Sequence, residues 1–195
     1  MTRNIEDVGI AVDLSIRMYL GDGMVRLTSE HKALPYRGSM DFHHADQYQT
    51  WCHKKFIYYQ TQVLNLLPDA RVEHIGSSSI PGAISKGDLD IFVGVHRDDH
   101  QNAVLTLTSL GFREKLETLR TPELCMLESD SENIALQVVA NDSKFEFFLV
   151  FRDKLCSDPT LVNQYNNLKK SCEGMSHNEY RNRKSIFIEQ VLSQA

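Results

Sequence analysis

The chain has 195 residues, of which 42% are hydrophobic, and its formal net charge is −5 at pH 7. This length and apolar content predict one domain with a sizeable core. The negative charge argues against general nucleic-acid binding, and the absence of an apolar run of about 18 residues argues against a transmembrane helix. The four cysteines form no CxxC pair and the N-terminus has no apolar signal region, so we expect a cytoplasmic protein with reduced thiols.

The predicted domain begins after an N-terminal extension. Residues 1–33 show no clear pattern, and residues 34–195 are predicted as one domain. Apolar residues at helical spacing predict a helix over residues 46–67. A second helix is predicted over residues 98–110 and ends at Gly111, which suits a left-handed C-terminal cap.

The second half of the domain is predicted as short strands followed by two helices. The strands are expected at residues 112–117, 124–128 and 134–140, with residues 145–150 as a possible further strand. Each of the two helices has a recognisable start. The first begins at Asp158-Pro159, an N-cap followed by proline, and the second at Ser176 with Glu179, a capping box.

Two aspartates open a predicted strand over residues 88–95, the part of the chain that points most clearly to chemistry. Alternation places Leu89, Ile91, Val93 and Val95 on a core face, and Asp88 and Asp90 together on the opposite face. Two such carboxylates can hold one Mg²⁺ (or Mn²⁺), whose remaining ligands are typically phosphates and water. The alternative is that the two carboxylates only solvate one face of an edge strand.

A small-residue turn precedes this strand. Residues 72–75 are predicted as a short strand, and Gly76, Ser77 and Ser78 follow it. Successive backbone N–H groups in such a turn can form a site for anions, and a helix starting near Pro81 would add its N-terminal dipole. A phosphate site placed about ten residues before a metal site predicts chemistry on a nucleoside triphosphate.

The segment EHIGSSSIPGAISK, residues 73–86, resembles the EHIGSTSVPGLAAK segment of the GrpB-like family. Ile75-Gly76-Ser77 followed by Asp88-Leu89-Asp90 also resembles the signature of the wider DNA polymerase β-like nucleotidyltransferase superfamily. Near the C-terminus, FRDKL, YxxLK and YxxxKxxFI-like runs resemble motifs of the GrpB-like family and contain Arg152, Lys169 and Lys184. The resemblance spans roughly residues 34–192.

This resemblance implies an α+β fold: a nucleotidyltransferase-like core of a mixed β-sheet flanked by helices, with a C-terminal helical pair. It implies Mg²⁺-dependent transfer of a nucleoside monophosphate from a nucleoside triphosphate to an acceptor hydroxyl, phosphate or amine. Asp88 and Asp90 would then hold the metal. The phosphate-binding residues would be Gly76, Ser77, Ser78, His74 and Lys86 around the turn, with Arg152, Lys169 and Lys184 as outer charges.

The chain departs from the resembled pattern on the strand over residues 134–140. Ala135 and Gln137 stand where that family has histidines and where active superfamily members often carry a third carboxylate. Either one metal suffices, or Glu128, Glu132 or Asp142 substitutes from nearby. A third alternative is a binding module that has kept the fold and lost catalysis.

The histidines need separate interpretation. His74 adjoins the Gly-Ser turn and is expected either to orient the turn or contact substrate, or to be a hydrogen-bonded core residue. The remaining candidates for metal binding lack an accompanying cysteine or carboxylate pattern, so we interpret them as exposed loop and helix residues. They are His43, His44, His53, His96 and His100.

Overall fold

The computed structural model describes residues 41–116 and 118–194, so the expected extension over residues 1–33 lies outside the described residues. A five-stranded mixed sheet with the order β1-β2-β5-β4-β3 forms its centre. The strands are β1 (Arg71–Ile75), β2 (Leu89–Val95), β3 (Phe112–Glu114), β4 (Leu124–Ser129) and β5 (Ile134–Ala140). β2 and β5 are parallel, and the other neighbouring pairs are antiparallel.

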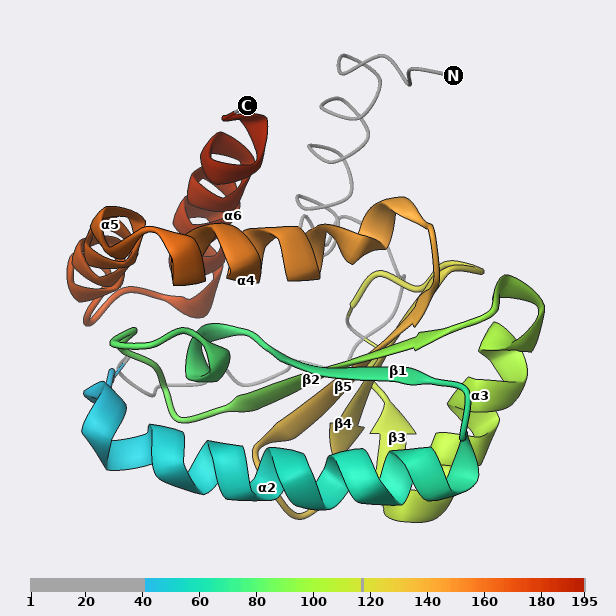
Figure 1. The fold of residues 1–195 in the computed structure, drawn as a ribbon. Helices are drawn as coiled ribbons and strands as arrows, with labels where there is room; N and C mark the ends of the chain where they lie inside the picture. The colour runs from blue at the N-terminus through green and yellow to red at the C-terminus, as the bar shows by residue number, and fades with distance from the viewer. Residues whose placement is uncertain (1–40, 117, 195) are drawn as a thin grey trace, which may run out of the picture.

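Helices cover both faces of this sheet (Figure 1). α2 (Ala45–Leu66) and α3 (His100–Leu107) pack on one face, with the apolar side chains of Leu89, Ile91 and Val93. α4 (Phe147–Ser157), α5 (Pro159–Lys170) and α6 (His177–Ser193) lie over the other face. The predicted α+β architecture with a C-terminal helical pair is therefore confirmed. None of the helices in the described ranges is both long and apolar enough to span a bilayer.

The ends of the elements follow the chemistry of their sequences. Asp158 accepts a hydrogen bond from the Thr160 backbone N–H at 2.7 Å, with proline at the first helical position. Ser176 and Glu179 form the predicted capping box. Gly111 has the left-handed φ of 82° that ends the helical segment before β3.

Two expectations about local structure are wrong. Residues 145–150 are not a strand: a short 3-10 turn (Lys144–Glu146) leads into α4, which begins at Phe147. No helix starts near Pro81 either, because the described chain there is a 3-10 turn (Ser77–Ser79) followed by a loop.

The loop over residues 76–87 is clamped between two helices. From α2, Tyr48 donates to the Ala83 carbonyl at 2.6 Å and Gln49 donates to the Ile80 carbonyl at 2.7 Å. From α5, the Asn166 side chain accepts from the Ile84 N–H and donates to the Gly82 carbonyl, both at 2.9 Å. These contacts satisfy backbone groups of the loop and fix its position.

Candidate functional site

A cavity of about 290 Å³ lies between the sheet and helices α4 to α6. The Gly76–Ser77 turn and both aspartates line it, as the alternation of β2 predicts. β2 is an inner strand between β1 and β5, so the alternative of two carboxylates on a solvated edge strand is wrong. Of the remaining predicted residues, three also line this cavity: Lys86, Lys169 and Lys184.

Gly76 brings the turn against Asp90. Ile75 is the register partner of Asp90, so the next residue of the chain passes over this carboxylate. A Cβ at Gly76 would overlap the Asp90 Oδ2 atom and lie 3.0 Å from the Asp90 Cβ. The φ of Gly76 is also 72°, in the left-handed region. Glycine is therefore required here both by backbone conformation and by close approach to the carboxylate.

The two carboxylates carry an electrostatic strain that a cation would relieve. Burial and then the charge of Asp88 raise the pKa of Asp90 to about 6. Burial also acts to raise the pKa of Asp88, but Lys86 and Lys184 outweigh it and lower that pKa. Lys86 Nζ lies 3.5 Å from Asp88 Oδ2. The Ser85 hydroxyl donates a hydrogen bond to Asp88 Oδ1 at 3.0 Å. Two oxygen-bearing carboxylates in one cavity fit the ligand preference of a single Mg²⁺ or Mn²⁺ ion.

No third carboxylate from the described part of the chain joins the pair. Within the described ranges, no group of three or more His, Cys, Asp or Glu side chains is placed to hold a metal ion. The expected substitutes lie elsewhere, because Glu132 is paired with Lys55 and Tyr59 beside α2, and Glu128 with Arg113 and Lys115. Asp142 follows the C-terminal end of β5, and it does not line the cavity. Substitution by one of these three acids is therefore not supported.

Gln137 occupies the place on β5 where a third carboxylate was considered. It lines the cavity, is 2% exposed, and its side chain hydrogen-bonds with Asp90. Ala135 is the register partner of Asp90 on the same strand. The neutral carboxamide of Gln137 faces the cavity.

Lys169 differs most from its predicted role. The sequence predicts an outer charge, but the side chain is 1% exposed. Its Nζ donates to the Ser77 hydroxyl at 2.7 Å and to the Ile84 carbonyl at 2.5 Å, and lies 3.8 Å from the centre of the Tyr165 ring. Burial, followed by the charge of Lys184, holds the pKa of Lys169 well below its usual value. Lys169 thus ties α5 to the floor of the cavity.

Lys184 has the opposite electrostatic character. The Tyr165 hydroxyl, ahead of the carboxylates of Asp90 and Asp88, raises the pKa of Lys184 above its usual value. This ammonium group therefore stays charged beside the two aspartates. With Lys86 it forms the cationic side of the cavity.

His74, Ser78 and Arg152 lie outside the lining of the cavity. The His74 ring stacks on Phe56 of α2 and its Nε2 is 2.9 Å from the Ser78 hydroxyl, which leaves it a hydrogen-bonded residue behind the turn. Burial lowers the pKa of His74 to about 4, with smaller contributions from His53 and Arg152. His74 is therefore neutral at pH 7 and orients the turn.

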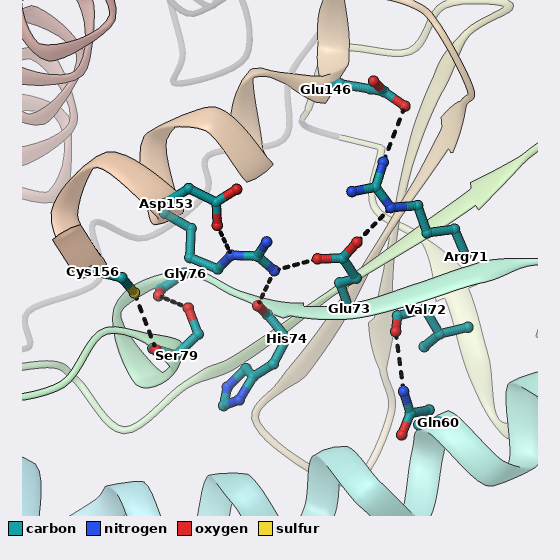
Figure 2. A network of polar contacts seen from close by, with 11 residues as sticks. Gln60, Arg71, Val72, Glu73, His74, Gly76, Ser79, Glu146, Asp153 and Cys156 are labelled. Atoms are coloured by element: carbon teal, nitrogen blue, oxygen red, sulfur yellow. Dashed lines mark hydrogen bonds and ion pairs between the residues drawn. The ribbon is translucent and has the colours of Figure 1, made fainter.

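Arg152 links α4 to β1. It contacts Glu73 at 2.6 Å, Asp153 at 2.8 Å and the His74 carbonyl at 3.1 Å. In Figure 2 the His74 ring is turned toward α2, away from Glu73 and Asp153. Arg152 therefore holds the helix that covers the cavity and does not itself reach into it.

Several lining residues were not found from the sequence. Aromatic side chains of α4, Phe147, Phe148 and Phe151, form an apolar wall, and Lys115 and His177 stand at other points of the lining. The prediction of a strand over residues 145–150 obscured the roles of Phe147 and Phe148, and Phe151 was noted only as part of the FRDKL run. Nothing local marks Lys115, because its position depends on the pairing of β3 with β4.

The isolated histidines are only partly as expected. His100 is 2% exposed and its Nε2 lies 3.0 Å from the Val138 carbonyl, so the expectation of an exposed helical residue is wrong there. His43, His44, His53 and His96 are exposed.

Known proteins show the same sequence pattern and fold. A model of the GrpB protein family matches residues 44–194. A UPF0157 protein of Vibrio cholerae serotype O1 is 56% identical over 178 residues, which cover 90% of this chain and 95% of that protein. A UPF0157 protein of Deinococcus radiodurans is 31% identical over 132 residues, covering 66% and 69%.

Solved structures agree. The crystal structure of conserved protein GrpB from Enterococcus faecalis has a TM-score of 0.63 at 20% identity and covers 79% of this chain and 98% of that one. A MgGTP-bound structure of the Cid1 poly(U) polymerase has a TM-score of 0.50 at 19% identity, covering 66% of this chain and 43% of that one. The chain belongs to the GrpB protein family, and its fold is similar to those of the Enterococcus faecalis GrpB protein and the Cid1 poly(U) polymerase.

Proposed function

We propose that this protein is a Mg²⁺-dependent nucleotidyltransferase that moves a nucleoside monophosphate from a nucleoside triphosphate to an acceptor. The observation that carries the proposal is the meeting of three features in one cavity. These are the glycine turn in contact with Asp90, the paired carboxylates, and four lysines from four separate parts of the chain. The MgGTP-bound state of the structurally similar Cid1 polymerase supports the same choice of ligand.

The residues of the cavity have separable roles in this proposal. Asp88 and Asp90 would hold the cation, which neutralises charge on the phosphates when bound. The Gly76–Ser77 turn receives the terminal phosphates through its N–H groups and hydroxyl. Lys169 Nζ donates a hydrogen bond to the Ser77 hydroxyl at 2.7 Å and fixes its position.

Charge balance supports a phosphate ligand. The formal charge of the chain is −5, yet its cavity is lined by four lysines and one arginine against two aspartates. Concentrating positive charge inside an acidic protein favours an anionic ligand in the cavity over nonspecific binding of polyanions elsewhere. His74, Ser78 and Arg152 act in this proposal from behind the turn, by holding it and α4 in place.

A second candidate is a nucleotide-binding module that does not transfer the nucleotide. Ala135 and Gln137 favour it, because neither of these β5 residues supplies a carboxylate beside Asp90.

Incubation with α-labelled nucleoside triphosphates, Mg²⁺ and cell extract separates the two candidates. We expect the wild type to transfer label to an acceptor. Gln137→Asp and Ala135→Asp place a carboxylate at the two alternative positions on β5. Transfer only by such a variant would show a decayed site on a competent scaffold. Tight nucleotide binding without transfer by any of the three proteins would support the binding module.

A further inference from the structure

The cavity extends well beyond the phosphate-binding turn. Ser77 follows β1, whereas Met126 lies on β4, three strands away in the sheet, or about 14 Å at the usual strand spacing. Asp90 on β2 lies between these two ends. We define the acceptor arm as the part lined by Lys115, Met126, Gln137, Phe147 and Phe148.

The acceptor arm combines an apolar interior with a cationic end. Gln137 and Met126 are register partners on the floor, and α4 covers this face of the sheet (Figure 1) and contributes Phe147 and Phe148. Lys115 pairs with Glu128 at 3.0 Å and hydrogen-bonds through its N–H to the Met126 carbonyl at 2.9 Å. Such a lining suits a ligand with an apolar, ring-bearing body and an anionic group.

Among the described residues, none that lines the acceptor arm is a carboxylate that could act as a base. The side chains beside Asp90 on β5 are a methyl group and a carboxamide, and Glu128, Glu132 and Asp142 do not line the cavity. A hydroxyl acceptor must lose its proton as it attacks, which normally requires a nearby base or a metal with a ligand on that side. An acceptor oxygen that is already anionic has no such requirement.

His177 is the histidine among the described lining residues, and it must be considered as an alternative base. It lines the cavity, but burial and then the charges of Lys86, Arg181 and Lys115 lower its pKa. A proton taken up by His177 would stand among three cations. The same three cations would stabilise a bound anion. The charges around His177 therefore favour binding of an anionic acceptor over removal of a proton from a neutral one.

The position of the acceptor follows from the geometry of displacement at phosphorus. The attacking and leaving oxygens lie roughly in line. In the proposed function the leaving pyrophosphate lies toward Ser77 and Lys169, at the β1 end of the cavity. The attacking oxygen must then approach from the β5–β4 side, where the acceptor arm lies.

We propose that the acceptor is a phosphate monoester with an apolar, ring-bearing body, bound in the acceptor arm. This inference rests on the proposed function. A phosphate oxygen forms a bond to the α-phosphorus, the bond from that phosphorus to the β-phosphate oxygen breaks, and pyrophosphate leaves with the electron pair. The dianionic acceptor gives up no proton, and the product is a nucleoside diphosphate ester.

Three compounds that share one ring test the chemistry: phenyl phosphate, benzoate and benzyl alcohol. Each is offered as acceptor with α-labelled nucleoside triphosphate and Mg²⁺. We expect labelled nucleoside diphosphate phenyl ester and pyrophosphate from phenyl phosphate, and at least tenfold less product from benzyl alcohol. Efficient transfer to benzyl alcohol, or transfer lost in His177→Gln, would overturn the proposal. Product from benzoate alone would overturn the phosphate assignment in favour of a carboxylate.

A binding experiment keeps this proposal separate from the proposed function. Phenyl phosphate is titrated calorimetrically into protein saturated with Mg²⁺ and an α,β-methylene nucleoside triphosphate. If the nucleotide does not bind, phenyl phosphate is titrated instead into the Lys169→Gln variant. Lys115→Gln should weaken phenyl phosphate about tenfold, because one charged hydrogen-bonding partner is lost. Arg113 still pairs with Glu128 at 2.7 Å in this variant, which protects the fold.

Lys170→Gln is the matched control, since Lys170 is exposed at the end of α5 and should leave binding unchanged. If phenyl phosphate binds with this dependence on Lys115 while no acceptor is modified, the anion subsite stands and the transferase proposal fails. If phenyl phosphate does not bind, or if Lys115→Gln and Lys170→Gln behave alike, the acceptor arm is not an anion subsite.

Discussion

At the scale of single residues, Gly76 and Gly82 form a matched pair. Both have left-handed φ angles, 72° and 74°, but a Cβ at Gly76 would overlap Asp90, whereas one at Gly82 would meet nothing within 4 Å. An alanine at either position should therefore lower the free energy of unfolding by about 1–3 kcal/mol through backbone strain. Only Gly76→Ala should also weaken Mg²⁺-nucleotide binding, by tenfold or more.

Urea unfolding gives the stability change of the two glycine variants, and calorimetric titration gives the nucleotide affinity. Equal nucleotide affinity in Gly76→Ala and Gly82→Ala would show that contact of the turn with Asp90 has no part in binding.

His74 predicts a dependence of stability on pH. Burial lowers its pKa in the folded protein to about 4, below its ordinary value of 6.5. The unfolded chain therefore binds more protons between these values, so the stability that neutral His74 provides is present above pH 6.5 and is lost as pH falls toward 4. His74→Gln keeps a group that can hydrogen-bond with Ser78 and removes this titration.

The measurement is the free energy of unfolding of wild type and His74→Gln between pH 4 and 7.5. The wild type should lose stability relative to the variant as the pH falls. A difference that does not change with pH would contradict a buried, neutral His74.

At the scale of elements, the seating of α4 depends on Arg152. Its side chain is 17% exposed and contacts Glu73, Asp153 and the His74 carbonyl. Arg152→Gln should cost about 1–3 kcal/mol, because it leaves partly buried acceptors without their charged donor. It should also weaken nucleotide binding, since α4 covers the cavity.

Arg97→Gln is the control for Arg152→Gln. Arg97 pairs with Glu123, but its side chain is 55% exposed, so its loss should change stability by no more than about 0.5 kcal/mol. Chemical denaturation of both variants tests the comparison. If Arg152→Gln lowers the free energy of unfolding as little as Arg97→Gln does, the contacts of Arg152 do not hold α4 in place.

The start of α4 also shows where the sequence is ambiguous. The run FFLVF at residues 147–151 is apolar at every position, and such a run has neither a helical nor a strand period. The strand predicted over residues 134–140 has the same bounds as β5. The local signals at Asp158 and Ser176 likewise predicted the starts of α5 and α6.

Lys169 shows why part of the site could not be predicted. A lysine in the last turn of a helix is normally solvated, and its sequence neighbours do not indicate otherwise. It is buried because α5 packs against the loop over residues 76–87, where Ser77 and Ile84 accept its hydrogen bonds. Such long-range packing also created the acceptor arm, whereas the turn and the two aspartates followed from a single continuous segment.

At the scale of the whole molecule, the two faces of the sheet differ in what they contain. The face covered by α2 and α3 is a continuous apolar core. The face covered by α4 to α6 contains both an apolar cluster and the polar cavity. Because β1 and β4 lie on either side of β2 and β5, one cavity can hold a nucleotide at one end and an acceptor at the other.

The central claim is that Asp88 and Asp90 bind a nucleoside triphosphate together with a divalent cation. Calorimetric titration of nucleoside triphosphates into wild type and Asp90→Asn, with and without Mg²⁺, tests it most directly. We predict that Mg²⁺ strengthens binding to the wild type at least tenfold, and that Asp90→Asn loses this dependence. Asp98→Asn, at an exposed acid far from the cavity lining, should behave as the wild type. Equal Mg²⁺-dependent affinity in wild type and Asp90→Asn, or no nucleotide binding by the wild type, would contradict the claim.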